Sequence, residues 1–172
     1  FLFNRLRKYD MEMALVDGYE GLLMDDIYPR TYLISDFKSC NDLLLDWEND
    51  KYVWVEKLGK SAEGKDIKIY ESLDPVRERF INPKTGACRK NDEKLIYQRY
   101  LTNPLLLNGK KSEIRSYWLI ASVNPLIVFY HDGLVRLNAK NFTYGDWENT
   151  LVHITNVARL KDYDPNYKET KK

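Results

Sequence analysis

A lysine at the end of an alternating segment is the first residue that could carry chemistry. Lys57 lies near the end of YVWVEKL, and a glycine-bearing stretch, GKSAEGK, leads from there to a second alternating segment, DIKIYES. The alternation predicts two strands, over 52–58 and 66–72. Such a lysine could hold a nucleotide, because its amine meets phosphate oxygens while the loop covers them. A hairpin with solvated lysines is the alternative that stays open.

Charged residues at alternate positions in KKSEIR form a second candidate. Period two places Lys111, Glu113 and Arg115 on one face of a strand. Two cations beside one carboxylate suit a phosphate-and-metal site, and Arg136 in the later segment GLVRLNA could add a further anion contact. The alternative is a solvent-facing ladder of opposite charges, which contributes little energy.

A third polar group, VHITN, follows apolar residues and contains His153, Thr155 and Asn156. A lone histidine is most often a structural residue, and two histidines in the chain make no zinc-type cluster. The sequence contains no Ser/His/Asp or Cys/His set that can be recognised, no Gly-x-Gly-x-x-Gly and no phosphate loop of the Gly-Lys-Ser/Thr type. The commonest nucleotide-binding folds are therefore not indicated.

Strands are expected to position most of these residues. Residues 40–49 are predicted to form a helix that packs on a sheet, and residues 72–94 a helical turn with a loosely fixed connection. The densest strand pattern is in KLIYQRYL, IRSYWLIASV, PLIVFYHD and GLVRLNA. Turns are expected at Asn108-Gly109, Asn124-Pro125 and Asp132-Gly133, so that the last three segments form an antiparallel meander.

Composition limits the class of protein. The 172 residues are 44% hydrophobic and 31% charged, typical of one folded, soluble domain or slightly more. The 27 Lys and Arg residues balance 26 Asp and Glu residues, which gives no general reason to expect nucleic acid or an anionic membrane. No apolar run approaches the roughly 18 to 20 residues that span a bilayer.

The cysteines and the first residue give two further expectations. Cys40 and Cys88 lie at no metal-ligand spacing, which indicates free thiols in a reducing, intracellular compartment. The sequence begins with Phe1 and shows no signal-peptide pattern, so we expect a fragment of a longer chain.

Five blocks, in order, resemble the tubulin tyrosine ligase-like proteins, which have an ATP-grasp fold. The blocks are YPRTYLIS, VWVEKLGKSAEGKDI, YQRYLTNPLLLNGKKSEIRSYWLIAS, DGLVRLNA and LVHITN, and the likeness runs from about Ile27 to Tyr167. The resemblance implies an α+β fold with antiparallel sheets backed by helices and an incomplete C-terminal end. The implied organisation is a lead-in segment (1–38), a partial ligase core (39–160) and a polar tail (161–172).

The resemblance also implies roles for particular residues, with ATP and Mg²⁺ as cofactors. Lys57 would contact the nucleotide phosphates, Gly64 would let the loop close, and the adenine-side hinge would be Gln98, Arg99, Tyr100 and Leu101. Lys111 and Arg115 would face the phosphates or an acyl-phosphate. Arg136 would bind a carboxylate substrate, Glu113 would keep the charge of a nucleotide-site carboxylate, and Thr155 with Asn156 would form the site floor.

Departures from the family pattern matter as well. The second glycine of the family's loop is Asp66 here, which adds a negative charge and a Cβ where backbone should approach phosphate. Ser112 and Glu113 replace a Phe-Asp pair. The carboxylate ligands of Mg²⁺ are expected beyond residue 172, and so the chain as given is not expected to catalyse ligation.

Two functions stay open. The first is an ATP-dependent ligase that adds glutamate, glycine or tyrosine to a tubulin tail through an acyl-phosphate. The second is an inactive ligase-like domain serving as a structural or binding module in a microtubule-associated or other large assembly. The third alternative is a soluble α/β domain that shares only its fold with the family.

The expected partner is the acidic tail of tubulin or the microtubule, with other proteins of a large assembly as further partners and neither nucleic acid nor membrane. The expected location is the cytoplasm and cytoskeleton, with the cilium or axoneme as a narrower alternative. Basic side chains could meet such a tail through salt-sensitive contacts: Arg5, Arg7, Lys8, Lys110 and Lys111.

Overall fold

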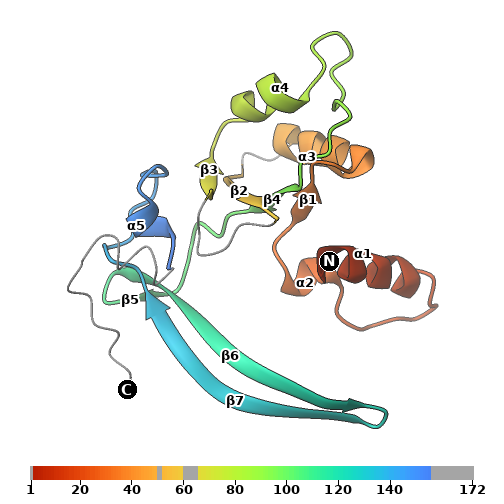
Figure 1. Cartoon of the computed structure of the whole chain (residues 1–172), viewed down its shortest axis with the longest axis vertical. Coiled ribbons are helices and arrows are strands. Elements are labelled where there is room, and N and C mark those ends of the chain that lie inside the picture. Colours follow the sequence, from red (N-terminus) through yellow and green to blue (C-terminus); the bar gives the residue numbers. More distant parts are fainter. Residues whose placement is uncertain (1, 50–51, 60–65, 156–172) are drawn as a thin grey trace. The chain divides into compact units, whose positions relative to one another are not determined.

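The computed structural model describes residues 2–49, 52–59 and 66–155. The described residues up to Leu101 form one compact unit, and those from Thr102 onward form a second. Both units are α+β with antiparallel strands, as expected (Figure 1). In the described ranges, no helix is both long and apolar enough to cross a membrane.

The first unit is built on a four-stranded antiparallel sheet with the order β1-β4-β2-β3. Its strands are β1 (Thr31–Leu33), β2 (Trp54–Leu58), β3 (Lys68–Tyr70) and β4 (Leu95–Arg99). The strands predicted over 52–58, 66–72 and 94–101 are confirmed as β2, β3 and β4. The central pair, β2 and β4, therefore carries both Lys57 and Gln98.

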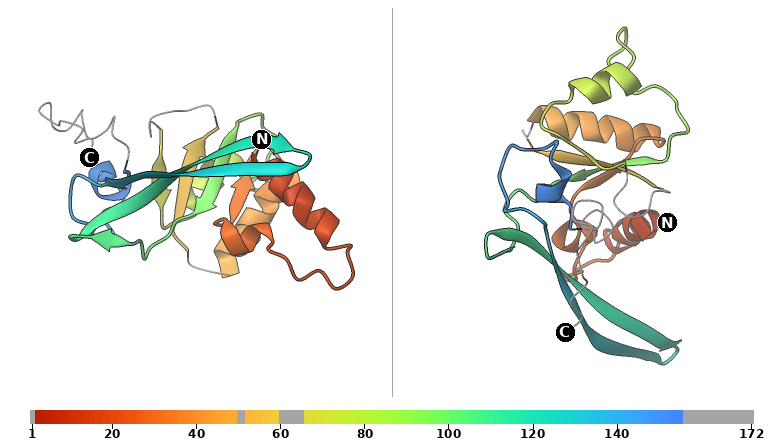
Figure 2. Two further views of the ribbon diagram at one scale, coloured as in Figure 1. Left: turned by 90° about the horizontal axis from the view of Figure 1, so that it is seen from below. Right: turned by 60° about the vertical axis from the view of Figure 1, so that its left-hand side comes forward.

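Two helices, α3 (Phe37–Asn49) and α4 (Asp74–Phe80), lie on the same side of this sheet (Figures 1 and 2). Between them and the sheet lies the apolar core, in which Trp47 of α3 stacks on Trp54 of β2 with ring centroids 5.5 Å apart. The helix predicted over 40–49 is thus confirmed, although it begins earlier. Asp36 accepts the backbone N–H of Ser39 at 2.7 Å, which satisfies a free donor of the first turn.

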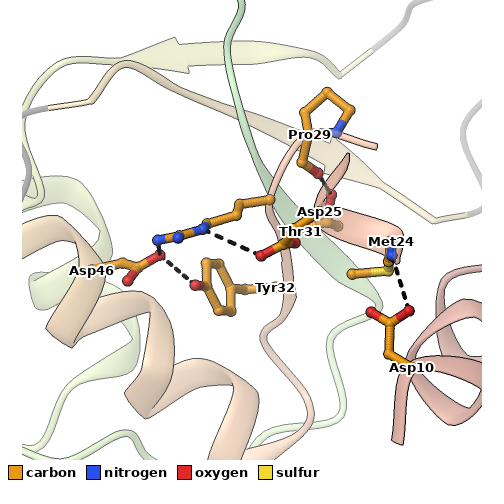
Figure 3. A network of polar contacts seen from close by, with 8 residues as sticks. Asp10, Met24, Asp25, Pro29, Thr31, Tyr32 and Asp46 are labelled. Atoms are coloured by element: carbon orange, nitrogen blue, oxygen red, sulfur yellow. Dashed lines mark hydrogen bonds and ion pairs between the residues drawn. The ribbon is translucent and has the colours of Figure 1, made fainter. Parts of the chain in front are cut away.

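Polar contacts tie the N-terminal helices α1 (Leu2–Met13) and α2 (Met24–Ile27) into the first unit (Figure 3). The Met24 backbone N–H donates to Asp10, with 2.9 Å between nitrogen and Oδ1. Arg30 joins the segment after α2 to α3, because its guanidinium pairs with Asp25 at 3.5 Å and with Asp46 at 2.9 Å. These contacts line a cleft of about 910 Å³.

The expectation of free thiols is wrong, because Cys40 of α3 and Cys88 form a disulfide with their Cα atoms 6.2 Å apart. The two cysteines are 48 positions apart in the sequence, and they meet because the segment after α4 packs back against α3. Ile81 forms an isolated bridge with Cys88, whose backbone N–H also donates to Asn41 at 3.2 Å. The connection within 72–94 is therefore anchored, not loosely fixed, and the thiol-based inference of a reducing compartment loses its support.

The second unit contains a three-stranded sheet with the order β5-β6-β7 and a short helix. These elements are β5 (Leu106–Leu107), β6 (Lys110–Val123), β7 (Leu126–Leu137) and α5 (Thr150–His153). The predicted turn at Asn108-Gly109 is confirmed, since both residues have positive φ angles, 52° and 76°, as a tight hairpin between β5 and β6 requires. The turn at Asn124-Pro125 joins β6 to β7.

The predicted meander is wrong, because PLIVFYHD and GLVRLNA form one continuous strand, β7, without a turn at Asp132-Gly133. Gly133 instead lies against the neighbouring strand, where an added Cβ would fall 1.3 Å from the carbonyl oxygen of Arg115. The pairing register shifts between Arg115 and Tyr117 at this point. The glycine thus permits a close backbone contact at an irregularity in the ladder.

Candidate functional site

The first candidate cluster lies on one face of the β2–β4 pair. Lys57 Nζ donates a hydrogen bond of 2.6 Å to Gln98 Oε1, and Gln98 Nε2 donates to Thr31 Oγ1 at 2.9 Å. Thr31 Oγ1 in turn donates to the carbonyl oxygen of Pro29 at 2.7 Å. Gln98 lies opposite Val55, two residues before Lys57, so both side chains share a face. Three strands therefore fix the position of the Lys57 amine.

The four residues expected to form an adenine-side hinge end the first unit, at Leu101. Arg99 and Tyr100 use their backbone N–H groups within the unit, donating to the carbonyl oxygens of Arg30 and Val53, each at 2.8 Å. The Arg99 guanidinium lies 3.5 Å from the ring centroid of Tyr52. Tyr100 is buried, and this burial raises its pKa, whereas Leu101 is exposed. Contact of these residues with an adenine ring stays a prediction.

The second candidate cluster lies at the start of β6 and the end of β7. Glu113 pairs directly with Arg136 across the two strands, and their side chains form an ion pair. The Thr155 hydroxyl donates to the same carboxylate, and Lys111 Nζ donates to the carbonyl oxygen of His153 at 2.9 Å. The Arg136 side chain is only 19% exposed. The ladder of opposite charges is thus partly buried and closed by residues around α5.

Arg115 does not join this cluster. It lies opposite Leu134, beside the register shift, and its side chain is exposed. The register is regular from Ser112 to Arg115, so the predicted period-two face includes Arg115, which lies two positions further along β6 than Glu113. Its expected role toward phosphate stays a prediction.

Asn138 belongs to this cluster and was missed, although its spacing of two residues from Arg136 placed it on the same face. Its side chain is 2% exposed and donates to the carbonyl oxygen of Val152. Within the described part of the chain, Asn138 Oδ1 and Arg136 Nε are buried without a hydrogen-bond partner. Buried polar atoms of this kind usually form a hydrogen bond with ordered water or a ligand.

His153 is a structural residue, as its isolation in the sequence suggested. Its Nε2 donates to the carbonyl oxygen of Asp146 at 2.8 Å, and its ring stacks on Trp147 with centroids 5.0 Å apart. Burial lowers the pKa of the His153 imidazole below its ordinary range. The neutral ring thus helps to fix the backbone of His153, whose carbonyl oxygen accepts the hydrogen bond from Lys111.

The loop after β2 is only partly described. Gly64 and Asn156 lie outside the described residues. Asp66 is described and has a φ of 59°, a left-handed conformation that favours glycine. The backbone here thus adopts a conformation that favours glycine, although the residue is acidic.

Each cluster, taken by itself, carries cations that suit an anion better than a metal ion. Lys57 in the first unit, and Lys111 and Arg136 in the second, are cations on backbone that is fixed by strand pairing. In the ranges that the structure describes, no three His, Cys, Asp or Glu side chains gather as a metal site. Glu113 already accepts from Thr155 and pairs with Arg136, so these residues alone do not fit Mg²⁺.

Antiparallel sheets, the first of them backed by helices, define an α+β protein and are consistent with an ATP-grasp-like fold. The model of the tubulin-tyrosine ligase family matches residues 5–172, and the chain belongs to this family.

Several curated relatives are similar over most of the chain. Tubulin monoglycylase TTLL3 of Mus musculus is 32% identical over 73% of the chain, and the probable tubulin polyglutamylase ttll-9 of Caenorhabditis elegans is 34% identical over 66%. Inactive polyglycylase TTLL10 of Homo sapiens is 29% identical over 67%. The chain spans 14%, 27% and 18% of the lengths of these three relatives.

Proposed function

We propose that the chain is the nucleotide-binding part of an ATP-dependent ligase that adds glutamate, glycine or tyrosine to a tubulin tail through an acyl-phosphate. The observation that carries this proposal is the hydrogen bond of 2.6 Å that holds the Lys57 amine against Gln98. Membership of the tubulin-tyrosine ligase family supports it, as do relatives named as a tubulin monoglycylase and a tubulin polyglutamylase.

The residues of the chain would act by binding and orienting charge. ATP supplies the phosphoryl group that activates a carboxylate. Lys57 holds phosphate oxygens, Lys111 and Arg115 meet phosphate or acyl-phosphate oxygens, and Arg136 binds a substrate carboxylate. Phosphoryl transfer needs such converging cations because negative charge spreads over the oxygens in the transition state.

Other residues of the site support this binding. Gly64 lets the loop close, Gln98 to Leu101 line the adenine, and Thr155 and Asn156 form the floor with Glu113 beside them. The Mg²⁺ ligands are proposed to lie outside residues 1–172.

The proposed partner is the acidic tail of tubulin, and a cytoskeletal location in the cytoplasm, cilium or axoneme follows from it. Arg5 and Lys8 are exposed on α1, but Lys8 lies 3.4 Å from Glu12 and Arg7 lies 3.8 Å from Asp42, so both have part of their charge neutralised. Contacts of exposed lysines and arginines with an acidic tail weaken as salt rises. Binding to tubulin tails that does not change between low and high salt would contradict this part of the proposal.

A second candidate function is an inactive ligase-like domain that serves as a structural or binding module. The specific observation that favours it is Asp66, an acidic residue with a φ of 59° at the end of the loop that would have to cover phosphate. A human relative named as an inactive polyglycylase shows that the family contains such proteins. A module of this kind would bind its assembly with Lys57 and Arg136 both replaced by alanine, whereas ligation requires both.

Incorporation of a labelled amino acid into tubulin tests the ligase proposal. The full natural protein is incubated with tubulin, Mg-ATP and labelled glutamate, glycine or tyrosine in separate reactions. One of the three is expected to enter tubulin only when ATP is present. Incorporation of none of them would overturn the ligase proposal in favour of the binding module.

A further inference from the structure

Glu56 is a buried carboxylate that the proposed function does not use. It precedes Lys57 in β2, and only 4% of its surface is exposed. An ionised group is costly to bury unless hydrogen bonds and opposite charge compensate for the lost water. The partners that compensate the buried Glu56 carboxylate therefore indicate its structural role.

The partners of Glu56 come from two other elements. The Tyr97 hydroxyl of β4 donates to the Glu56 carboxylate, and burial together with this bond raises the pKa of Tyr97, which keeps the phenol protonated as a donor. Arg79 of α4 lies 3.7 Å from the same carboxylate and also pairs with Glu93, in the segment before β4. Tyr70 of β3 stacks on Tyr97 with centroids 6.3 Å apart.

These contacts lie on the opposite face of β2 from Lys57. Glu56 pairs directly with Tyr97, whereas Lys57 pairs with Ile96 and its amine reaches Gln98 on the other face. Side chains alternate across a strand, so a slip of one residue would move Glu56 to the face of Gln98 and bury Lys57 among the aromatic rings. Only the observed register gives both charged side chains their partners.

We propose that Glu56, Tyr97 and Arg79 are positioning residues that hold β2 in register with β4 and thereby set the Lys57 amine against Gln98. The side chains of Glu56 and Tyr97 lie on the other face of the strand pair from Lys57 and act through its backbone. The consequence for nucleotide binding rests on the proposed function, but the consequence for the Lys57 amine does not.

The position of the Lys57 amine can be tested by its reactivity. The folded chain is acylated with a limiting amount of an N-hydroxysuccinimide ester, and each lysine is quantified by peptide mass spectrometry. Tyr97→Phe and Glu56→Ala are expected to raise the rate at Lys57 at least about threefold, since loss of the pairing releases the amine from Gln98. Glu56→Gln keeps an acceptor for Tyr97 and is expected to stay close to the wild type.

Two controls separate positioning from loss of folding. Exposed Lys38 on α3 reports general exposure of lysines, and Glu71→Ala removes an exposed carboxylate just after β3. Neither the Lys38 rate in the variants nor the Lys57 rate in Glu71→Ala should change. Equal increases at Lys38 and Lys57, or an unchanged Lys57 in both Tyr97→Phe and Glu56→Ala, would overturn the proposal.

A double-mutant cycle tests the same proposal through Mg-ATP affinity. Tyr97→Phe is expected to weaken binding about tenfold in the wild-type chain and not at all when Lys57 is already alanine, because its effect passes through Lys57. Equal losses in both backgrounds would contradict positioning. If the wild-type chain binds no Mg-ATP, the proposed function fails, while the reactivity of Lys57 still decides this proposal.

Discussion

The Lys57 amine and the Gln98 side-chain oxygen lie 2.6 Å apart although 41 residues separate them in the sequence. The sequence predicts Lys57 as a nucleotide contact from its place near a strand end, and the family resemblance implies the same role for both residues. Strand pairing between β2 and β4 brings them together, and Thr31 on β1 extends the hydrogen-bonded chain. The first cluster thus rests on the pairing of strands β1, β2 and β4.

Arg136 and Arg115 should respond differently to replacement by alanine. Arg136→Ala leaves the Glu113 carboxylate without its ion-pair partner, so we expect the free energy of unfolding to fall by about 1 to 3 kcal/mol. Arg115 is exposed, and its replacement should change stability by less than about 0.5 kcal/mol. Urea unfolding of both variants checks this. Equal losses of stability would contradict the burial difference between the two arginines.

Replacement of Asp66 by glycine should stabilise the chain and strengthen nucleotide binding together. The left-handed conformation at φ 59° costs a non-glycine residue about 1 kcal/mol, part of which the entropy of glycine offsets. Loss of the carboxylate also removes repulsion of phosphate. Asp66→Asn is the matched control, because it removes the charge without adding backbone freedom. Weaker Mg-ATP binding by Asp66→Gly would show that the loop does not approach phosphate at this residue.

The disulfide should contribute strongly to stability. Cross-linking two residues 48 positions apart restricts the unfolded chain, and removing both cysteines as Cys40→Ser with Cys88→Ser should cost about 4 kcal/mol. Thermal unfolding with and without a dithiol reductant measures the effect, and the double variant should not respond to reductant. Two titratable thiols per folded, oxidised chain would disprove the bond.

Protonation of His153 should destabilise the second unit. Burial lowers the pKa of the folded imidazole, so the unfolded chain binds a proton first as the pH falls through 6.5. The free energy of unfolding should therefore be highest above pH 6.5 and decrease below it, until His153 of the folded chain also takes up a proton. Urea unfolding between pH 5 and 8, with His153→Gln as the reference, measures this. If the His153→Gln variant loses as much stability at low pH as the wild type does, the loss comes from a group other than His153.

Local patterns predicted much of the fold and of the first cluster. The alternation around Lys57 predicted β2 and β3, and the turn residues Asn108-Gly109 predicted the start of β6. Non-local contacts could not be predicted in the same way. Asp132-Gly133 is typical of a turn, but Gly133 lies against Arg115 of another strand. The partner of Cys40 lies beyond three intervening elements, β2, β3 and α4.

For the candidate site, too, local patterns predicted the residues but not their non-local contacts. Glu113 and Arg136 were both named, but their pairing depends on the register of β6 with β7, which the sequence does not fix. Asn138 was missed because a lone asparagine near a strand end is typical of a turn. Glu56 was passed over because a charged residue next to a lysine is usually solvated, and its compensation by Arg79 comes from α4.

Calorimetric titration of the chain with Mg-ATP tests the central claim most directly. The wild-type chain is expected to bind one nucleotide with micromolar affinity, and Lys57→Ala should weaken this binding ten- to a hundredfold, roughly the value of a charge-assisted hydrogen bond. Lys38→Ala on exposed α3 is the matched control and should bind as the wild type does. No binding at millimolar ATP, or equal affinity in the wild type and Lys57→Ala, would contradict a nucleotide site at Lys57.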